Sequence, residues 1–372
     1  MSRVTAQDVK QSNYLNIYRL FFHHELLSKP QIARLLKLSL PTVVNNVSAL
    51  EAEGKIQENG MCAPQGGRPA TAYRLVDDAA VSIGVEIQSK SIKCAVINLK
   101  GDISTVNYFM VNFENSLNYI QSLCHTINGF IADQGYNDSR ILGVGISFQG
   151  IANKDGQTIL YGKILPYDHL SVATLQPYFA YPVILLHDVK CAANAELWHA
   201  KQHIHNAVYI SVSEHLGGAL ILNNQIDQGK QGYSGALEHF RINDNGNPCY
   251  CGQIGCLETY CSLTALLQSG ESLEHFFLKL RTDDQPTYAR WLRFLTYFAK
   301  ALNYVYLLLE RDIILGGEIA PYLRDEDLSL LSRLVENHAP FPLSGQFIRI
   351  AALQQNAALI GAGLPFIRKY IP

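Results

Sequence analysis

The chain has 372 residues, of which 48% are hydrophobic and 17% charged, and its formal net charge is −2. This length predicts two or three domains, and the composition is that of an ordinary well-cored protein. No apolar run approaches the roughly 18 residues of a membrane span, and the first eight residues lack the apolar segment of a signal peptide. Eight cysteines, three of them clustered, fit a reducing cytosol better than a disulfide framework. We therefore expect a cytoplasmic protein without membrane insertion.

The charge is unevenly distributed along the chain. Residues 1–75 carry nine Lys/Arg against five Asp/Glu, a net +4, which leaves −6 on the remainder. A basic N-terminal part joined to an acidic body predicts that any nucleic acid binds at the N-terminal part.

The pattern of the first 78 residues predicts a winged helix-turn-helix. Apolar residues recur at helical spacing over 14–22, and a capping box at Ser28–Gln31 opens a second helix. Ser39 can cap a third helix over about 40–53, which Gly54 ends. Its apolar stripe is expected at Val43, Val44, Val47 and Leu50, leaving Thr42, Asn45, Asn46 and Ser48 outward. Short polar side chains of this kind suit base edges in a major groove, although a protein-docking helical module remains an alternative.

Residues 55–58 and 72–75 flank a glycine-bearing loop, as two wing strands would. Within it, Gly66-Gly67-Arg68-Pro69 has the composition of arms that insert a cation into the narrow minor groove of A·T tracts. Arg68 is therefore a candidate DNA contact. The alternative is a simple interdomain linker.

From Val81 the pattern changes to strands mixed with helices. Strands are expected at 81–87, 91–97, 141–146, 183–186, 207–213 and 218–222, and helices at 117–134 and 192–200. The second half thus repeats the strand-rich start of the first. Antiparallel strands mixed with crossover helices predict two α/β lobes around a cleft.

Three thiols lie within eight positions, Cys249, Cys251 and Cys256, separated by glycines and preceded by His239. Together they make a complete Cys₃His set, which predicts one structural zinc ion per chain because no coordination position is left for water. Unligated thiols are one alternative. Another is a Cys₄ site in which Cys261 replaces His239, but a helix starting near Leu257 would turn Cys261 away.

The run Gly235…His239…Cys249-x-Cys251-Gly252-x-x-Gly255-Cys256-Leu257-Glu258 resembles the zinc signature of the ROK family (repressors, open reading frames, kinases). The order helix-turn-helix, Gly-Arg-Pro, Arg74-Leu75 resembles the N-terminal region of its repressors, including those that respond to glucose and N-acetylglucosamine, and is absent from its kinases. The resemblance implies an α/β body of two ribonuclease-H-like lobes, as in the actin and sugar kinase superfamily. We place the DNA-binding domain at 1–78, the first lobe at 79–190 completed by a C-terminal helix at 353–372, and the second lobe, with the zinc site and a dimerisation surface, at 191–352.

The same resemblance shows where the chain departs from a kinase. The family's first phosphate turn, Asp-x-Gly-Gly-Thr, is Glu86–Lys90 here, and its second, Gly-Thr-Gly, is Ser213–His215. Side chains now occupy the phosphate approach, and Glu214 adds a repelling carboxylate. We predict that ATP binding is lost and that the chain is not an enzyme. The alternative is a hexose kinase with an added DNA-binding head.

The resemblance also implies sugar contacts. Asp188 matches the family's base, and His239 and Glu258 match its sugar-binding positions. The family's sugar-contacting Glu is Ala236 here, while a glutamate appears two residues later at Glu238. The pocket therefore keeps part of its polar set. Asp188 and Glu258 as ordinary structural carboxylates remain an alternative, as does a repressor that needs no ligand.

These features together predict a sugar-responsive repressor of carbohydrate uptake or metabolism genes. We expect a homodimer or a dimer of dimers on a palindromic A·T-rich operator, associated with the nucleoid. A sugar or sugar phosphate would be the effector, and a sugar-transport protein a further partner. Zinc would order the loop that carries His239 and Glu258, so that a bound sugar alters lobe closure and the spacing of two recognition helices.

Overall fold

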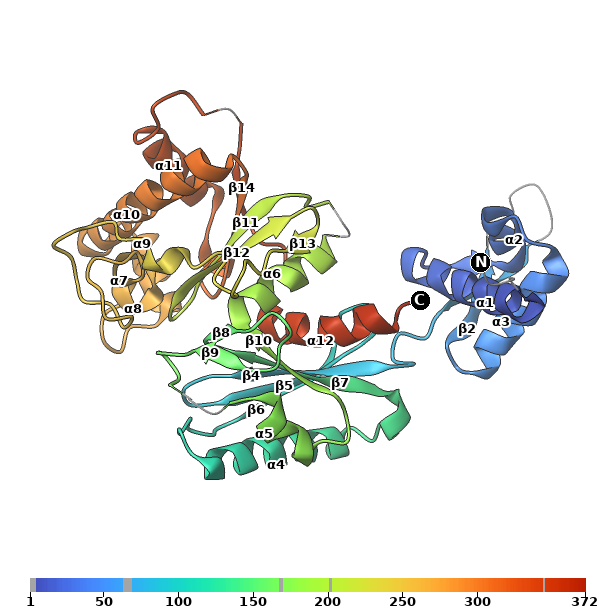
Figure 1. Cartoon of the computed structure of the whole chain (residues 1–372). Coiled ribbons are helices and arrows are strands. Elements are labelled where there is room, and N and C mark those ends of the chain that lie inside the picture. Colours follow the sequence, from blue (N-terminus) through green and yellow to red (C-terminus); the bar gives the residue numbers. More distant parts are fainter. Residues whose placement is uncertain (1–4, 63–68, 167–169, 201–202, 344) are drawn as a thin grey trace.

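The computed structural model describes residues 5–62, 69–166, 170–200, 203–343 and 345–372. They form a small N-terminal unit, here called the head (residues 5–75), and a larger two-lobed body (Figure 1). None of the helices in these ranges is long and apolar enough to cross a membrane.

The head contains the three helices and the strands that the sequence predicts. Its elements are α1 (Ala6–His23), β1 (Leu27–Ser28), α2 (Lys29–Leu36), α3 (Leu40–Ala52), β2 (Ile56–Cys62) and β3 (Ala70–Leu75). The strands form an antiparallel sheet in the order β1-β3-β2. The predicted caps are confirmed: the Gln31 side chain accepts the backbone N–H of Ser28 at 2.8 Å, and the Ser39 hydroxyl accepts that of Thr42. Arg68 lies outside the described residues.

The face that α3 buries differs from the prediction at two positions. Val43, Val47 and Leu50 are fully buried, as expected, but Val44 is 37% exposed and Asn46 only 6% exposed. At 100° per residue Asn46 falls inside the stripe and Val44 falls beside it. The Nδ2 of Asn46 donates to the carbonyl of Thr42 at 2.7 Å, which satisfies the buried amide. Asn46 is therefore a core residue and not an outward one.

The first lobe is built on a five-stranded sheet. Its strands are β4 (Val81–Ile87), β5 (Ile92–Ile97), β6 (Ile103–Phe109), β7 (Ile141–Phe148) and β10 (Val183–His187), in the order β10-β7-β4-β5-β6. The hairpin β4–β5 and the next strand are antiparallel, whereas β7 and β10 run parallel to β4. Helix α4 (Leu117–Asp133) packs its apolar side chains into the same core as these strands.

Helix α12 (Ala357–Tyr370), at the end of the chain, packs on this sheet at unusually short range. A Cβ on Gly84 of β4 would lie 2.1 Å from the carbonyl oxygen of Leu359, and one on Gly145 of β7 would lie 1.9 Å from that of Ala362. On the other side, Gly361 of α12 faces the backbone of Cys191 in α6 (Asp188–His199) equally closely. These glycines allow α12 to lie between the first sheet and α6.

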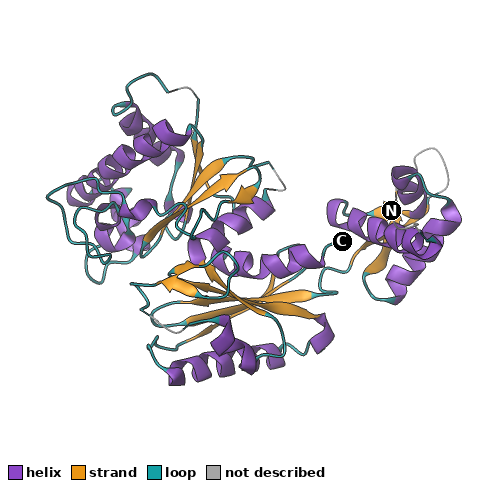
Figure 2. Cartoon of the chain, viewed as in Figure 1, coloured by secondary structure: helices purple, strands orange, loops and turns teal. Residues whose placement is uncertain are grey.

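The second lobe repeats the strand order of the first. Its sheet contains β11 (Ala207–Val212), β12 (Leu216–Leu222), β13 (Gln225–Ile226), β14 (Asp312–Gly316) and β15 (Ile348–Ile350), in the order β13-β12-β11-β14-β15. In both sheets three consecutive antiparallel strands are followed by two that run parallel to the first. This confirms the predicted repeat, and Figure 2 shows both sheets with helices against them. The helices of this lobe are α7 (Glu258–Cys261), α8 (Leu263–Leu266), α9 (Leu273–Leu280), α10 (Gln285–Leu309) and α11 (Asp325–Glu336).

Three short elements complete the first lobe: β8 (Ile151–Ala152), β9 (Ile159–Tyr161) and α5 (Val172–Leu175). The C-terminal end of the chain returns to the head, beside α1 (Figure 1). There the Arg19 Nε donates to the Pro372 carbonyl oxygen at 2.5 Å, and the rings of Tyr18 and Tyr370 lie 6.4 Å apart, edge to face.

Candidate metal centre and interlobe cavity

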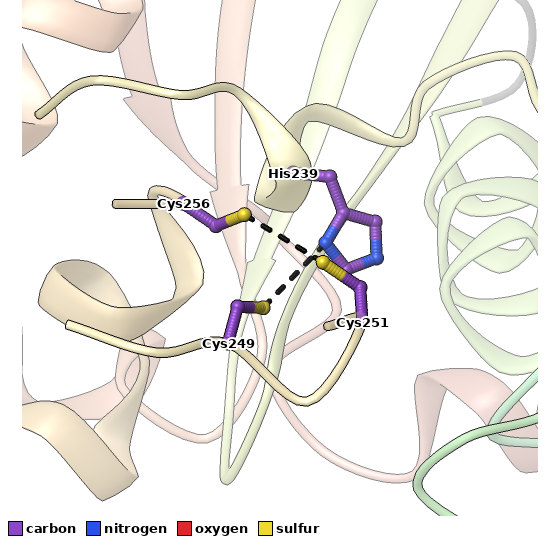
Figure 3. A group of neighbouring side chains, drawn as sticks. All are labelled: His239, Cys249, Cys251 and Cys256. Carbon is purple, nitrogen blue, oxygen red and sulfur yellow. Dashed lines mark hydrogen bonds between the residues drawn. The ribbon is translucent and has the colours of Figure 1, made fainter. Parts of the chain in front are cut away.

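The four predicted metal ligands converge on one point. The ligand atoms of His239, Cys249, Cys251 and Cys256 all lie within 4.8 Å of one another (Figure 3). Cys251 Sγ lies 3.7 Å from Cys256 Sγ, and Cys249 Sγ lies 3.8 Å from His239 Nδ1. Tetrahedral zinc with Zn–S bonds of about 2.3 Å requires sulfurs about 3.8 Å apart. The donor set and its spacing therefore fit a tetrahedral metal ion.

The loop that carries the cysteines is folded by two glycines with positive φ. Gly252 (φ 91°) follows Cys251 and donates its N–H to the Cys249 carbonyl at 2.9 Å. At Gly255 (φ 73°) a Cβ would lie 1.6 Å from the Asn243 carbonyl oxygen, so no other residue fits. The glycines of the motif are thus required by the turn that brings the sulfurs together.

Cys261 takes no part in this cluster. It is fully buried in the core of the second lobe, and its thiol contacts the carbonyl of Phe294 at 3.6 Å. The Cys₄ alternative is therefore wrong, and the helix over 258–261 turns Cys261 away as expected.

A cavity of about 480 Å³ lies between the lobes, beside the metal cluster. Its wall includes the carboxyl ends of parallel strands from both sheets, where α/β sheets commonly bind ligands. Of the predicted sugar-binding residues, Asp188, Glu238 and His239 line it. Asp188 is the first residue of α6, directly after β10, and His239 ends a short 3₁₀ helix, Leu237–His239.

The buried carboxyl groups of this wall have few polar partners to stabilise their charged forms. Burial raises the pKa of Asp188 to about 7, helped by the charge of Glu86. Burial likewise raises the pKa of Glu238 to about 8, and no described group hydrogen bonds to its buried Oε2. The Nδ1 of His187 is also buried without a partner among the described residues, and burial lowers the pKa of His187 to about 3. Buried polar groups without hydrogen-bond partners are typical of ligand-binding sites.

The two turns that would bind phosphates in a kinase line another part of the cavity. Glu86 and Gln88 come from the first turn, and Glu86 pairs with Lys93 at 3.3 Å. In the second turn the Ser213 hydroxyl accepts the backbone N–H of Glu318 at 3.1 Å. Burial also raises the pKa of Glu318. Carboxyl groups and a hydroxyl therefore occupy these turns.

Glu258 lies behind the wall of the cavity. Its Oε1 is 2.7 Å from His215 Nδ1, and its Oε2 accepts the backbone N–H of Leu216 at 2.7 Å. Burial lowers the pKa of His215, but the hydrogen bond and the charge of Glu258 outweigh it, so that pKa is above its usual value. Among the described residues that line the cavity are His215 and not Glu258, and the ligand contact of Glu258 stays a prediction.

On the head, the candidate DNA contacts are only partly available. Asn45 and Ser48 are exposed on α3, and Thr42 is half-buried, with its hydroxyl 2.8 Å from that of Ser39. Asn46 is buried and is therefore no longer a candidate DNA contact.

The family model of the ROK family matches residues 82–368. The chain belongs to the ROK family. A curated relative, the xylose repressor of Caldicellulosiruptor bescii, is 28% identical over 262 residues, which is 70% of this chain and 66% of that protein. The match thus spans just under two thirds of the relative's length.

Two solved structures show how far the ROK fold extends. A ROK family transcriptional regulator described as a homologue of the E. coli MLC protein covers 98% of this chain and 96% of its own, with a TM-score of 0.75 and 19% identity. A ROK family glucokinase from Streptomyces griseus, in complex with glucose and AMPPNP, covers 77% of this chain and 99% of its own, with a TM-score of 0.67 and 21% identity. The regulator therefore matches nearly the whole chain, and the glucokinase matches about three quarters of it.

Among the wall residues that sequence reasoning did not assign to the ligand site are His215 and Tyr250. The Tyr250 ring lies edge to face with both His215 and His239, at 5.5 and 5.3 Å. Tyr250 is the residue between Cys249 and Cys251, and that position was the signal that could have found it.

Proposed function

We propose that this chain is a sugar-responsive transcriptional repressor of carbohydrate uptake or metabolism genes. One observation carries the proposal: a head with exposed Asn45 and Ser48 is joined to a ROK body in which Glu86–Lys90 and Ser213–His215 contain no glycine. The name of the xylose repressor and the likeness of the whole chain to a regulator support the same function.

The head is proposed to bind DNA as a winged helix-turn-helix, with α3 in the major groove. Asn45 and Ser48 would reach base edges, and Thr42 would assist at the start of the helix. Arg68, in the loop between β2 and β3, stays a proposed minor-groove contact that favours A·T tracts. A homodimer or a dimer of dimers on a palindromic operator would place two such helices in successive grooves. Such a repressor would act in the cytoplasm at the nucleoid, with a sugar-transport protein as a further partner.

Zinc is the proposed metal, one ion per chain. Three thiolates and one imidazole suit it, and the set is complete without water, so its role would be structural. His239 points Nδ1 at the cysteines and has Nε2 3.8 Å from Glu238 Oε1. The ion would therefore fix one wall of the cavity.

A sugar or sugar phosphate is the proposed effector, held by Asp188, Glu238 and His239. We propose that the chain does not transfer phosphate from ATP. Glu86 and Glu318 face the part of the cavity where a kinase binds polyphosphate, and two like charges about 4 Å apart repel by several kcal/mol at a partly buried site.

Helix α12 offers a physical connection between the cavity and the head. Asn356, Ala357 and Ala358 line the cavity at its start, and Tyr370 contacts Tyr18 of α1 at its end. Because the helix is continuous, a ligand that shifts its first turn relative to the lobes also acts on the head. Coupling of this kind is typically worth about 1–3 kcal/mol.

The purified protein tests the proposal directly. We expect it to retard A·T-rich palindromic DNA from the control region of carbohydrate genes, and a sugar from an aldose panel to release the DNA. With ATP and the same panel we expect no phosphoryl transfer, using a ROK glucokinase as the positive control. Sugar phosphorylation without DNA binding would establish the kinase alternative instead.

A further inference from the structure

His215 lines the cavity but belongs neither to the candidate metal centre nor to the proposed sugar contacts. It ends the segment Ser213–His215, which replaces the family's second phosphate turn, and its side chain lines the cavity. A glycine at this position would leave room for phosphate oxygens, whereas an imidazole fills that room and brings two ring nitrogens.

Glu258 is buried and held by two partners in this arrangement. It is 5% exposed, and its two carboxylate oxygens are both engaged at 2.7 Å, one by His215 Nδ1 and one by the Leu216 N–H. Its oxygens keep further lone pairs, but His215 and not Glu258 is among the described residues that line the cavity. The side chain that meets a ligand here is therefore His215.

The His215 ring is fixed on two sides. Glu258 holds Nδ1, and the Tyr250 ring packs edge to face at 5.5 Å with an interplanar angle of 81°. The other ring nitrogen, Nε2, has no hydrogen-bond partner among the described residues. An imidazole held at one nitrogen has a defined tautomer and orientation, so its free nitrogen is a ready contact for a hydroxyl group.

We propose that His215 makes the ligand-hydroxyl contact at this end of the cavity and determines specificity there. Glu258 and Tyr250 act as positioning residues for its ring. The proposal rests on the proposed sugar-binding function and deepens it, because it assigns the contact to a residue at the former phosphate turn. The ligand is a polyhydroxy compound with a hydroxyl group, and not a phosphate, at this end, since Asp188 and Glu318 line the same cavity.

Two substitutions separate the two ring nitrogens. In His215→Asn the amide replaces Nδ1, so the bond to Glu258 survives while the ligand contact is lost. In His215→Gln the amide reaches the place of Nε2 and retains part of the ligand contact. Because the Asn variant keeps the buried carboxylate paired, we expect it to fold like the wild type. His275→Ala, an exposed histidine on α9, is the matched control.

The experiment is a calorimetric titration of the full chain with D-xylose, D-glucose and their monodeoxy forms. In the wild type we expect the loss of one particular hydroxyl to weaken binding by about 10- to 100-fold. In His215→Asn the parent sugar should bind as weakly as that deoxy sugar, so the affinity difference between the two sugars falls to within about twofold. His215→Gln should keep part of this difference, and His275→Ala should keep all of it.

A deoxy penalty that stays unchanged in His215→Asn would overturn the proposal, even if all affinities fell together, because a structural role weakens every sugar alike. If no sugar of the panel binds to the wild type, the proposed sugar-binding function itself fails. That outcome is seen before any variant is made.

Discussion

The head and the body hold their candidate functional residues in opposite ways. On the head, Asn45 and Ser48 project from a helix surface whose buried face is filled by apolar side chains. In the body, Asp188 and Glu238 are largely buried in a cavity wall, with pKa values raised by burial. Residues on an exposed surface can be changed without loss of stability. Buried ionisable groups in a cavity wall, in contrast, lower the stability of the ligand-free protein.

The largest effect is expected at the proposed metal centre of the body. Cys256→Ser should abolish stoichiometric zinc and lower the free energy of unfolding by more than about 4 kcal/mol, because metal binding contributes directly to folding. Metal analysis and thermal denaturation measure both effects. Cys261→Ala is the control: it leaves a small cavity in the core but should keep the metal. Zinc retained in Cys256→Ser and lost in Cys261→Ala would contradict the ligand set.

The next largest effect is expected on α3, where the exposed Asn45 and the buried Asn46 are neighbours. Asn45→Ala should weaken operator binding by about tenfold or more, at unchanged thermal stability, because it removes a proposed base contact. Asn46→Ala should instead cost about 1 kcal/mol of stability, because it removes the buried bond to the Thr42 carbonyl. Gel retardation and thermal denaturation distinguish them, with Val44→Ala as control. Equal loss of DNA affinity in both asparagine variants, at unchanged stability, would argue against the assignment of faces.

The same pair shows what the sequence could and could not predict. Residue spacing predicted the Cys/His cluster and the elements of the head, since Cys-x-Cys and capping boxes act over a few residues. The buried face of α3 was predicted wrongly at two positions: Val44 was expected inside because it is apolar, and Asn46 outside because it is polar. Tertiary packing of the head buries Asn46 and leaves Val44 exposed instead.

Residue spacing along the chain could not predict the contacts within the cavity. His215 and Glu258 are 43 residues apart and meet only because β12 and α7 are neighbours in the fold. The sequence showed that glycines were missing from the phosphate turn, but not that the replacing histidine would cover the glutamate behind it. Contacts between distant segments need the fold before they can be predicted.

A moderate effect is expected when the buried carboxyl of Asp188 is made neutral. Its pKa of about 7 in the folded protein exceeds that of an unfolded aspartate, so folding favours the protonated form and stability falls as the pH rises from about 4 to 7. Asp188→Asn should therefore raise stability by about 1–2 kcal/mol at pH 8 and have little effect at pH 4. Denaturant titrations at both pH values check this, with the exposed Asp155→Asn as control. A gain that is equal at both pH values would exclude the ionisation of Asp188 as its cause.

The smallest effect concerns the connection between the two regions. Tyr370→Ala removes the ring that packs against Tyr18, at the end of α12 far from the cavity. We expect sugar-free operator affinity to stay within about twofold, because no candidate DNA contact is changed. The weakening of DNA binding by sugar should fall by about fivefold, which corresponds to about 1 kcal/mol of lost coupling. By linkage, operator DNA should also weaken sugar binding less in Tyr370→Ala than in the wild type. Lys369→Ala, exposed in the same turn, is the matched control and should respond as the wild type does. If Tyr370→Ala keeps the full response in both titrations, the contact between Tyr370 and Tyr18 does not carry the signal. The Arg19–Pro372 hydrogen bond and the connection at residues 76–80 would then be the remaining routes to the head.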